Sequence, residues 1–235
     1  MNCAAAFGWV DTEGVFGSSS TSALSATFSD GALISHEGGG RVNPDALGSA
    51  SAQVAGTTSN LTWGRWTGGT SEAGFSAVHY VVGIPTPNIG SLSGSFSFNV
   101  GGWTTPTTTI ANLGAFNGIT GNLYANFDYS QVDTNFTVDY ANHDYQLYTS
   151  SPIAIRSDST FDGSVNTGGG IPTGSGPSCT AFGCSAAISG FFAGANASNA
   201  GLSYHLSDPS AGKLTGAVVF DNVGSMSVSV TDGVP

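Results

Sequence analysis

The sequence has very little charge, and nearly all of that charge is negative. Four Lys and Arg residues stand against fifteen Asp and Glu residues, so the formal net charge is −11 over 235 residues. Nucleic acids and anionic membranes are bound by clustered cations that neutralise phosphate groups. The cations of this chain are scattered along it, at Arg41, Arg65, Arg156 and Lys213. The composition therefore argues against nucleic acid and against an anionic membrane surface as partners.

The chain also lacks long apolar runs. No segment reaches the roughly 18 consecutive apolar residues of a membrane-spanning helix. The first residues lack the basic and apolar regions of a signal peptide, so we expect either a chain that stays inside the cell or a processed form. Apolar residues still make up 40% of the chain and aromatic residues 11%. That content is too high for a disordered chain, and the length is sufficient for a sizeable core.

Cysteine is scarce, with three residues in the whole chain. Cys179 and Cys184 enclose four residues of a Gly/Pro/Ser-rich loop, and a structural zinc site would need four ligands. The spacing favours a small disulfide-closed loop, with two free thiols as the alternative. A disulfide would indicate an oxidising compartment such as the periplasm, the cell surface or the medium. Cys3 is left over and could be free, lipid-modified or bridged to another chain.

Glycine is abundant, with 35 residues, and the dominant pattern in the chain is an alternation of apolar and polar residues. In Leu92–Val100 the even positions are apolar or Gly and the odd positions are Ser or Asn, which predicts a half-buried strand. About ten segments follow this pattern, with short returns that favour antiparallel pairing over parallel pairing. They include Leu61–Trp66, Val78–Gly83, Leu123–Tyr129, Phe136–Tyr140, Tyr145–Tyr148, Ile188–Phe192, Leu202–Leu206, Leu214–Phe220 and Met226–Val230.

So many antiparallel strands must protect their edges, and closure into a barrel does so completely. We predict an all-β, up-and-down barrel of about eight strands, with a two-sheet β-sandwich as the alternative. The expected organisation is an N-terminal β-rich extension over 1–47, the barrel over 48–220 and an extra strand or tail over 221–235. A hairpin is expected at Ala26–Ile34, around an Asp-Gly turn. The spare C-terminal strand could pair with that hairpin or with another molecule.

Two stretches near the C-terminus carry a family resemblance. Ile188–Tyr204, with its Gly-Phe-Phe and Gly-Leu-Ser-Tyr motifs, and the closing strand Leu214–Phe220 resemble the barrel of transferrin-binding-protein-B-like surface proteins. Upstream, Trp63–Gly69 and His79–Pro87 resemble the C-terminal barrel region of some bacterial FecR-domain proteins. The resemblance implies a Gram-negative envelope or surface barrel used for binding or assembly.

The chain departs from the family pattern at two positions. Ala195 stands where the family usually has Pro, and Asn199 stands where an acidic residue is frequent. Transferrin recognition belongs to particular members of the family and is not implied for this chain.

The four histidines are dispersed, at His36, His79, His143 and His205. Alternation places His79 and His205 opposite apolar neighbours, so we expect solvent-facing strand histidines. There is no Cys-x-x-Cys-His or His-x-x-x-His motif for haem or metal. We therefore predict no metal and no cofactor, with haem bound through these histidines as the alternative.

No motif indicates catalysis. The chain has no Gly-x-Ser-x-Gly elbow between a strand and a helix. The carboxylates that cluster in sequence fall on polar strand faces or in turns, so we expect a solvated acidic rim with at most weak Ca²⁺ affinity rather than a glycosidase pair. These are Asp128, Asp133, Asp139 and Asp144. We predict that the protein is not an enzyme.

Three tryptophans are candidates for contact with a partner: Trp63, Trp66 and Trp103. Trp63 and Trp66 lie three residues apart, so a strand sends them to opposite faces and at most one belongs to the core. An exposed Trp on a neutral barrel could contact a protein, a sugar or a lipid headgroup, with packing as the alternative.

Together these features predict a non-enzymatic envelope or extracellular β-barrel module that acts as an assembly subunit or a protein-binding surface protein. A protein partner or a homo-oligomer is expected, with membrane association only through a partner or an anchor. The expected location is the bacterial surface, the outer membrane or the medium, or alternatively the periplasm. The alternative functions are a secreted or surface haem or iron-source binder and an integral outer-membrane barrel.

Overall fold

A computed structural model describes residues 5–11, 16–21, 25–29, 32–37, 51–67, 77–168, 179, 183–209 and 211–225. Before residue 56, and at residues 66, 67 and 77, it describes the backbone alone. Among the described residues, no helix is long and apolar enough to cross a membrane. The expected strand Met226–Val230 and the residue Cys3 lie outside the described residues.

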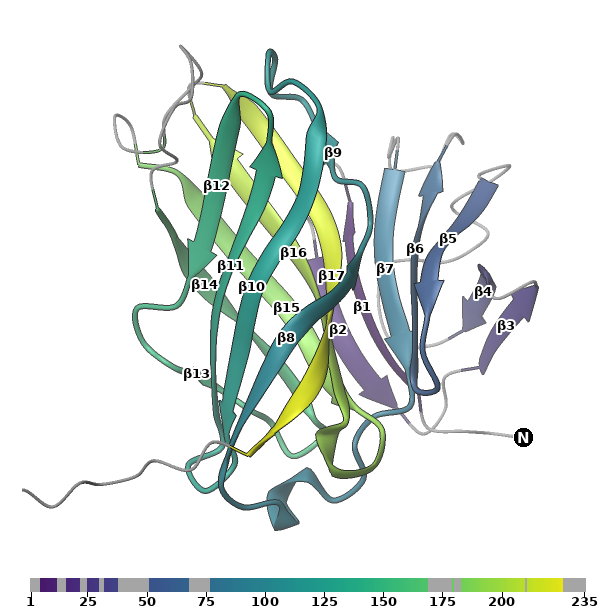
Figure 1. The fold of residues 1–235 in the computed structure, drawn as a ribbon. Coiled ribbons are helices and arrows are strands. Elements are labelled where there is room, and N and C mark those ends of the chain that lie inside the picture. Colours follow the sequence, from purple (N-terminus) through teal and green to yellow (C-terminus); the bar gives the residue numbers. More distant parts are fainter. Residues whose placement is uncertain are drawn as a thin grey trace, which may run out of the picture.

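Eight antiparallel strands close into a barrel (Figure 1). Around the barrel the order is β8-β17-β16-β15-β14-β12-β11-β10, and β10 pairs again with β8. The predicted all-β barrel is confirmed. The strands are β8 (Ser95–Trp103), β10 (Phe116–Asn126), β11 (Gln131–Tyr140), β12 (His143–Tyr148), β14 (Thr160–Gly168), β15 (Ser185–Ala193), β16 (Asn199–Asp208) and β17 (Gly212–Ser225).

Shorter elements border the barrel. Strand β9 (Thr107–Thr108) pairs with β17, and β13 (Ile153–Ala154) pairs with β11. The 3₁₀ turns η2 (Ile89–Ser91) and η3 (Ala195–Ala197) lie in the connections before β8 and between β15 and β16.

The barrel interior is filled by the apolar residues of the alternating pattern. Phe98, Leu123, Phe136, Tyr204 and Phe220 are all fully buried and belong to one core cluster. Rings from different strands meet edge to face or tilted, for example Phe136 and Tyr204 with centroids 5.4 Å apart. The side chains between these positions point away from the interior, as the period of two requires.

A second, five-stranded sheet lies beside the barrel (Figure 1). This small sheet has the order β2-β1-β7-β6-β5, and a separate hairpin pairs β3 with β4. The hairpin confirms the one predicted at Ala26–Ile34. The strands are β1 (Ala5–Asp11), β2 (Phe16–Thr21), β3 (Ser25–Ser29), β4 (Ala32–Glu37), β5 (Ser51–Thr57), β6 (Leu61–Thr67) and β7 (Ala77–Gly83).

The boundary between the two sheets differs from the expected one. Strands β5, β6 and β7 belong to the small sheet, so the barrel begins at Ser95 and not near residue 48. The last barrel strand runs to Ser225, so residues 221–225 belong to the barrel wall. Alternation alone could not locate this boundary, because the strands of the two sheets have the same period.

The small sheet packs on the outer surface of β15 and β17. Leu61, Trp63 and Val81 of the small sheet form a buried cluster with barrel residues. The barrel contributes Phe191, Ala193, Ala217 and Val219. These barrel residues point away from the interior, so this part of the wall is apolar on both faces.

Candidate functional site

One end of the barrel gathers exposed apolar side chains. Among the described residues, four large apolar side chains are exposed: Ile84, Trp103, Tyr129 and Val223. Tyr129 lies in the turn between β10 and β11, and we call this end of the barrel the Tyr129 end. Ile84 and Val223 lie at the same end, whereas Trp103 lies at the far end of β8.

Hydrogen bonds show why these residues share one end. The Ile84 carbonyl accepts from the Gly194 amide at 2.9 Å, just before η3. On the other side of η3, the amide of Asn222, next to Val223, donates to the Ser198 carbonyl at 3.1 Å. Strand β17 ends beside the start of β8, which pairs with the end of β10, where the Tyr129 turn begins.

The turn that carries Tyr129 is well defined. The Tyr129 amide donates to the Asn126 side-chain oxygen at 3.3 Å, and the Ser130 amide donates to the Phe127 carbonyl at 3.2 Å. An Asn at such a position stabilises a turn through its own side chain. The Tyr129 side chain is 73% exposed, so a rigid backbone presents a large ring to solvent. Because the backbone of this turn is already ordered, little conformational entropy would be lost when a partner contacts the Tyr129 ring.

A pocket opens beside this turn. It has a volume of about 150 Å³. A cavity of that size holds one benzene-sized group. The pocket is lined by Ile89, Gly90, Phe127, Ser130, Ile155, Arg156 and Ser157.

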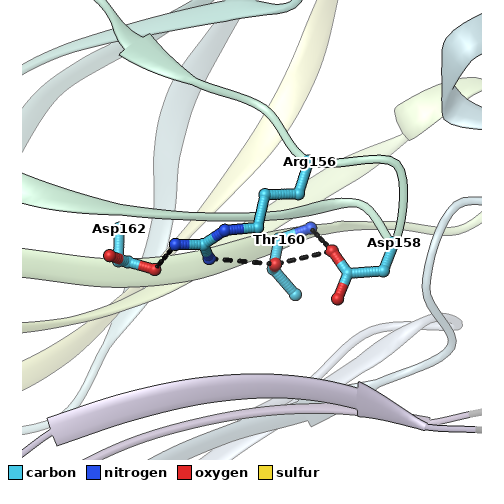
Figure 2. Close-up of polar contacts among 4 residues, drawn as sticks. All are labelled: Arg156, Asp158, Thr160 and Asp162. Atoms are coloured by element: carbon cyan, nitrogen blue, oxygen red, sulfur yellow. Dashed lines mark hydrogen bonds and ion pairs between the residues drawn. The ribbon is translucent and has the colours of Figure 1, made fainter.

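Arg156, at the edge of the pocket, is held by a polar network (Figure 2). Its guanidinium forms an ion pair with Asp162 and donates to the Thr160 hydroxyl at 3.3 Å. That hydroxyl donates to Asp158 at 2.6 Å, and the Thr160 amide donates to the same oxygen at 3.1 Å. Both members of the ion pair are about half exposed, so the pair itself adds little stability. The network positions Arg156 and leaves this end of the barrel with more carboxylates than cations.

His79 is not exposed, which corrects the prediction for this residue. Alternation placed it on the correct face of β7, but that face packs on the barrel. His79 is fully buried, with Nδ1 2.8 Å from the Thr104 hydroxyl and Nε2 2.9 Å from the Thr107 hydroxyl. Burial, helped by the positive charge of Arg65, lowers the pKa of His79 to about 3. Both ring nitrogens are occupied, so His79 could not ligate haem in this fold.

The other histidines are separated from one another. His143 points into the barrel, contrary to the prediction, with its ring centroid 4.4 Å from that of Tyr145. His205 points outward from β16 as predicted but is half-buried. Burial lowers the pKa of both residues. For His143 the nearby carboxylates of Asp144 and Asp208 act in the opposite direction, whereas for His205 the positive charge of Lys213 adds to the lowering. His36 lies on β4, and its side chain is outside the described part of the chain.

The end of the barrel opposite Tyr129 has a polar interior. Neither ring nitrogen of His143 has a hydrogen-bond partner among the described residues, and the same holds for the hydroxyls of Tyr145 and Tyr204. Burial raises the pKa of Tyr145 above its usual range, and that of Tyr204 as well. Cys179 and Cys184 form a disulfide here, as the spacing favoured, and their sulfurs lie within 4.8 Å of the Asp208 carboxylate. Joined sulfurs offer no thiolate, so this group is not a metal site in the oxidised protein.

The three candidate tryptophans have different environments. Trp63 is 7% exposed and packs between the small sheet and the barrel, so the structure corrects its assignment as a partner contact. The Trp66 side chain is outside the described residues. Trp103 is 37% exposed at the last position of β8 and remains a candidate.

The acidic residues occupy strand faces and a turn, as predicted. Asp128 lies in the exposed Tyr129 turn, and Asp133, Asp139 and Asp144 lie on the outward faces of β11 and β12. Their predicted weak affinity for Ca²⁺ stays a prediction.

Sequence reasoning missed the residues of the Tyr129 end. Tyr129 fits the alternation of Leu123, Ala125 and Phe127, so it was assigned to the buried face of a strand. The signal against this was Asp128-Tyr129-Ser130, a polar run that ends the strand. Nothing local in the sequence distinguishes Ile84 or Val223 from buried strand residues.

No protein-family model matches the chain, and no curated protein matches it by sequence. Solved structures do match. The intact Ap-TbpB, with N and C lobes, gives a TM-score of 0.56 at 14% identity over 93% of this chain and 46% of that one. A transferrin-binding protein B from serogroup B Neisseria meningitidis gives 0.52 at 13% identity, over 93% and 43%. A variant of the transferrin-binding protein B of Haemophilus parasuis gives a TM-score of 0.55 at 12% identity, over 93% of this chain and 45% of that one.

This chain therefore spans less than half the length of these neighbours. The resemblance to FecR-associated barrels receives no support from these comparisons. At such low identity the likeness concerns the fold alone: the chain is similar in fold to about half of a transferrin-binding protein B.

Proposed function

We propose that this chain is a non-enzymatic protein-binding module at the surface of a Gram-negative cell or outside it, and that the Tyr129 end of the barrel is its contact surface. The observation that carries the proposal is that Ile84, Tyr129 and Val223 are exposed at one end of the barrel, where a pocket also opens beside the Tyr129 turn. Protein interfaces concentrate their binding energy in exposed aromatic and apolar anchors that meet such pockets.

The likeness in fold supports a binding role. The neighbours are described as transferrin-binding proteins, so this fold occurs in proteins that bind another protein. Their ligand is not assigned to this chain, because the likeness covers less than half of each neighbour. The Cys179–Cys184 disulfide supports an oxidising compartment, which fits a surface or extracellular location.

The polarity of the wall bears on the alternative of an integral outer-membrane barrel. Such barrels place apolar residues outward and polar residues inward. Here Phe98, Leu123 and Phe136 fill the interior, while Asn99, Asn122 and Asn135 line the outer face. This arrangement supports a water-facing wall. Haem binding is not advanced, because the described residues bring no two histidines together.

The test is the native mass of the protein purified from its own cells without detergent, compared with its Tyr129→Ala/Ile84→Ser variant. We expect the wild type in a complex larger than the 23.5 kDa of one chain. The variant should be monomeric, or its complex should dissociate at least about tenfold more readily, as expected when an anchor residue is lost.

The control is Asn166→Ala, which changes an exposed residue of β14 on the outer wall. It should behave as the wild type does. Because the changed side chains are exposed, all three proteins should give the same far-UV circular dichroism spectrum. A monomeric wild type, or a complex that survives the double substitution, would refute the proposed surface.

A further inference from the structure

The exposed ring of Tyr129 and the pocket at the Tyr129 end share one stretch of backbone. Phe127 and Ser130, on either side of Asp128 and Tyr129, both line the pocket. The Ser130 carbonyl accepts a hydrogen bond from the amide of Ile155, another lining residue, at 2.8 Å. This bond ties the opposite part of the lining to the turn. The ring and the pocket are therefore neighbours on one surface, at a spacing that the backbone fixes.

The pocket matches a phenol side chain in size and in polarity. Its volume of about 150 Å³ holds a benzene-sized group. Its apolar part consists of the buried side chains Ile89, Phe127 and Ile155. Its polar groups are two hydroxyls and a guanidinium, from Ser130, Ser157 and Arg156. A tyrosine combines an apolar ring of this size with one hydroxyl that forms hydrogen bonds. Tyr129, which is 73% exposed, presents such a ring beside the pocket.

The charges beside the ring and beside the pocket are of opposite sign. Asp128, next to Tyr129 in the turn, is exposed. Arg156 at the edge of the pocket is half-exposed. A guanidinium has five N–H donors, and the contacts drawn in Figure 2 use two of those of Arg156. Arg156 can therefore bond a further carboxylate while it stays in its network.

A surface that carries both a ring and a matching pocket is complementary to itself. In a two-fold dimer each copy places the same group in the other copy. An axis that passes between Tyr129 and the pocket brings each ring to the pocket of the other copy, and each Asp128 towards the other Arg156. The formal charge of −11 on each copy opposes this approach, so we expect a weak dimer that depends on these contacts.

We propose that the pocket at the Tyr129 end binds the Tyr129 ring of a second copy of this chain, so that two copies form a symmetric dimer through two identical contacts. This inference rests on the contact surface proposed above and names its partner. The ring stands on an ordered turn and the pocket is already formed, so association requires little reorganisation.

The first experiment is sedimentation of the full chain purified alone, over a series of concentrations. Tyr129→Ala removes the ring and leaves the pocket. Gly90→Leu narrows the pocket and leaves the ring, and the fold accepts it because a Cβ at Gly90 meets nothing within 4 Å. We expect the wild type to dimerise with a dissociation constant of about 100 μM or less, in the range of a transient contact. Each variant should dimerise about a hundredfold more weakly, because both contacts are lost at about tenfold each.

A mixture of the two variants provides the specific test. The Tyr129→Ala chain keeps its pocket and the Gly90→Leu chain keeps its ring, so a mixed pair retains one of the two contacts. Isotope-labelled Tyr129→Ala is titrated with unlabelled Gly90→Leu and followed by NMR. We expect saturable shifts of the pocket amides of Ser130, Arg156 and Ser157, with a dissociation constant about tenfold above that of the wild type. Unlabelled Tyr129→Ala should not shift these signals.

Ser91→Leu is the matched control for Gly90→Leu. Ser91 is exposed in the same 3₁₀ turn but does not line the pocket, so the same side chain is added outside it. This variant should dimerise as the wild type does. Asp128→Asn should weaken the dimer about threefold or more, because two exposed charge pairs with Arg156 are lost.

Three results would overturn the proposal. The first is a wild-type chain that stays monomeric when purified alone. A larger complex from its own cells would then leave the proposed function standing, with a different partner. The second is a dimer of wild-type strength in Gly90→Leu, which would show that the ring docks elsewhere. The third is a mixture that associates no better than each variant alone, which would show that the ring and the pocket do not meet.

Discussion

His79 lies between the small sheet and the barrel, where the hydroxyls of Thr104 and Thr107 form hydrogen bonds with its two ring nitrogens. The same residue on an open strand would titrate near its ordinary pKa of 6.5. In the folded state its pKa is about 3, so between these two values the unfolded chain binds a proton that the folded chain does not. Stability therefore falls as the pH falls through this window.

The first prediction follows from that difference. On going from pH 7 to pH 4, His79 should cost the wild type about 3 kcal/mol of unfolding free energy. In His79→Gln the loss over the same range should be smaller by about that amount, because glutamine does not titrate. Urea unfolding at the two pH values measures both quantities. Equal pH dependence in the two proteins would show that His79 is not buried in its neutral form.

Asp144 gives a prediction of opposite sign. Its pKa is raised in the folded state, so its ionisation as the pH rises above the ordinary carboxyl range costs the folded protein stability. Asp144→Asn should raise the unfolding free energy at pH 7 by about 0.5 kcal/mol. The value is small because solvent screens the repulsion between Asp144 and Asp139. The gain should vanish near pH 3, where Asp144 is protonated. Urea unfolding of the two proteins measures this difference in unfolding free energy. A variant that is less stable than the wild type at pH 7 would contradict the repulsion between Asp144 and Asp139.

Strand β10 requires a glycine at position 121. Gly121 has a φ of 136°, and a Cβ there would lie 2.3 Å from the Asn135 carbonyl oxygen and 2.5 Å from the Phe136 Cα. Both contacts are with the backbone of β11, which cannot move without breaking its pairing with β10. The alternating pattern shows a Gly at this position but gives no sign of this close approach.

Gly121→Ala should therefore destabilise the protein by about 3 kcal/mol or more, since the strained backbone and the clash add. Gly90→Ala is the control, because a Cβ at Gly90 meets nothing within 4 Å. That change should alter stability by less than about 0.5 kcal/mol. Thermal and urea unfolding of the two variants provide the measurement, and similar stabilities would show that β10 and β11 can separate locally at this point.

The strands themselves could be predicted, because alternation is a local property. Ile188–Phe192, Leu202–Leu206 and Leu214–Phe220 all fall inside observed strands. The predicted ends of the strands were less accurate than the predicted positions. Strand β17 continues to Ser225 because its last residues pair with the beginning of β8, which lies more than 120 positions away in the chain, and no local pattern contains such a contact.

The whole molecule is joined by an apolar interface in which Trp63 is central. A Cβ built on Gly56 of the small sheet or on Gly102 of the barrel would lie 2.2 Å from Cζ2 of Trp63. The indole is thus enclosed by glycine backbones from both sheets. This explains why Trp63 is buried.

Trp63→Ala should cost about 3–5 kcal/mol, the usual range for a buried aromatic residue. The loss should fall mainly on the small sheet, since the barrel closes on itself without it. Hydrogen exchange of β6 and β7 should therefore become faster than that of β15 and β17. Val223→Ala, at a residue that is 56% exposed, serves as the control and should leave exchange unchanged. Uniformly faster exchange in all strands would show that the two sheets unfold as one unit.

The sequence by itself determined that this protein is an antiparallel β protein, because period-two alternation and short returns are local consequences of strand geometry. It favoured a closed barrel over a β-sandwich, and the pairing of β10 with both β8 and β11 decided between them. The pairing of Cys179 with Cys184 was also favoured locally, by a spacing of five residues. Only the tertiary structure decided which outward faces are covered. It buried His79 and Trp63 against the barrel, turned His143 inward, and left Tyr129 and Trp103 exposed. The physical reason is that alternation divides a strand into two faces, whereas burial of either face depends on a second sheet distant in sequence.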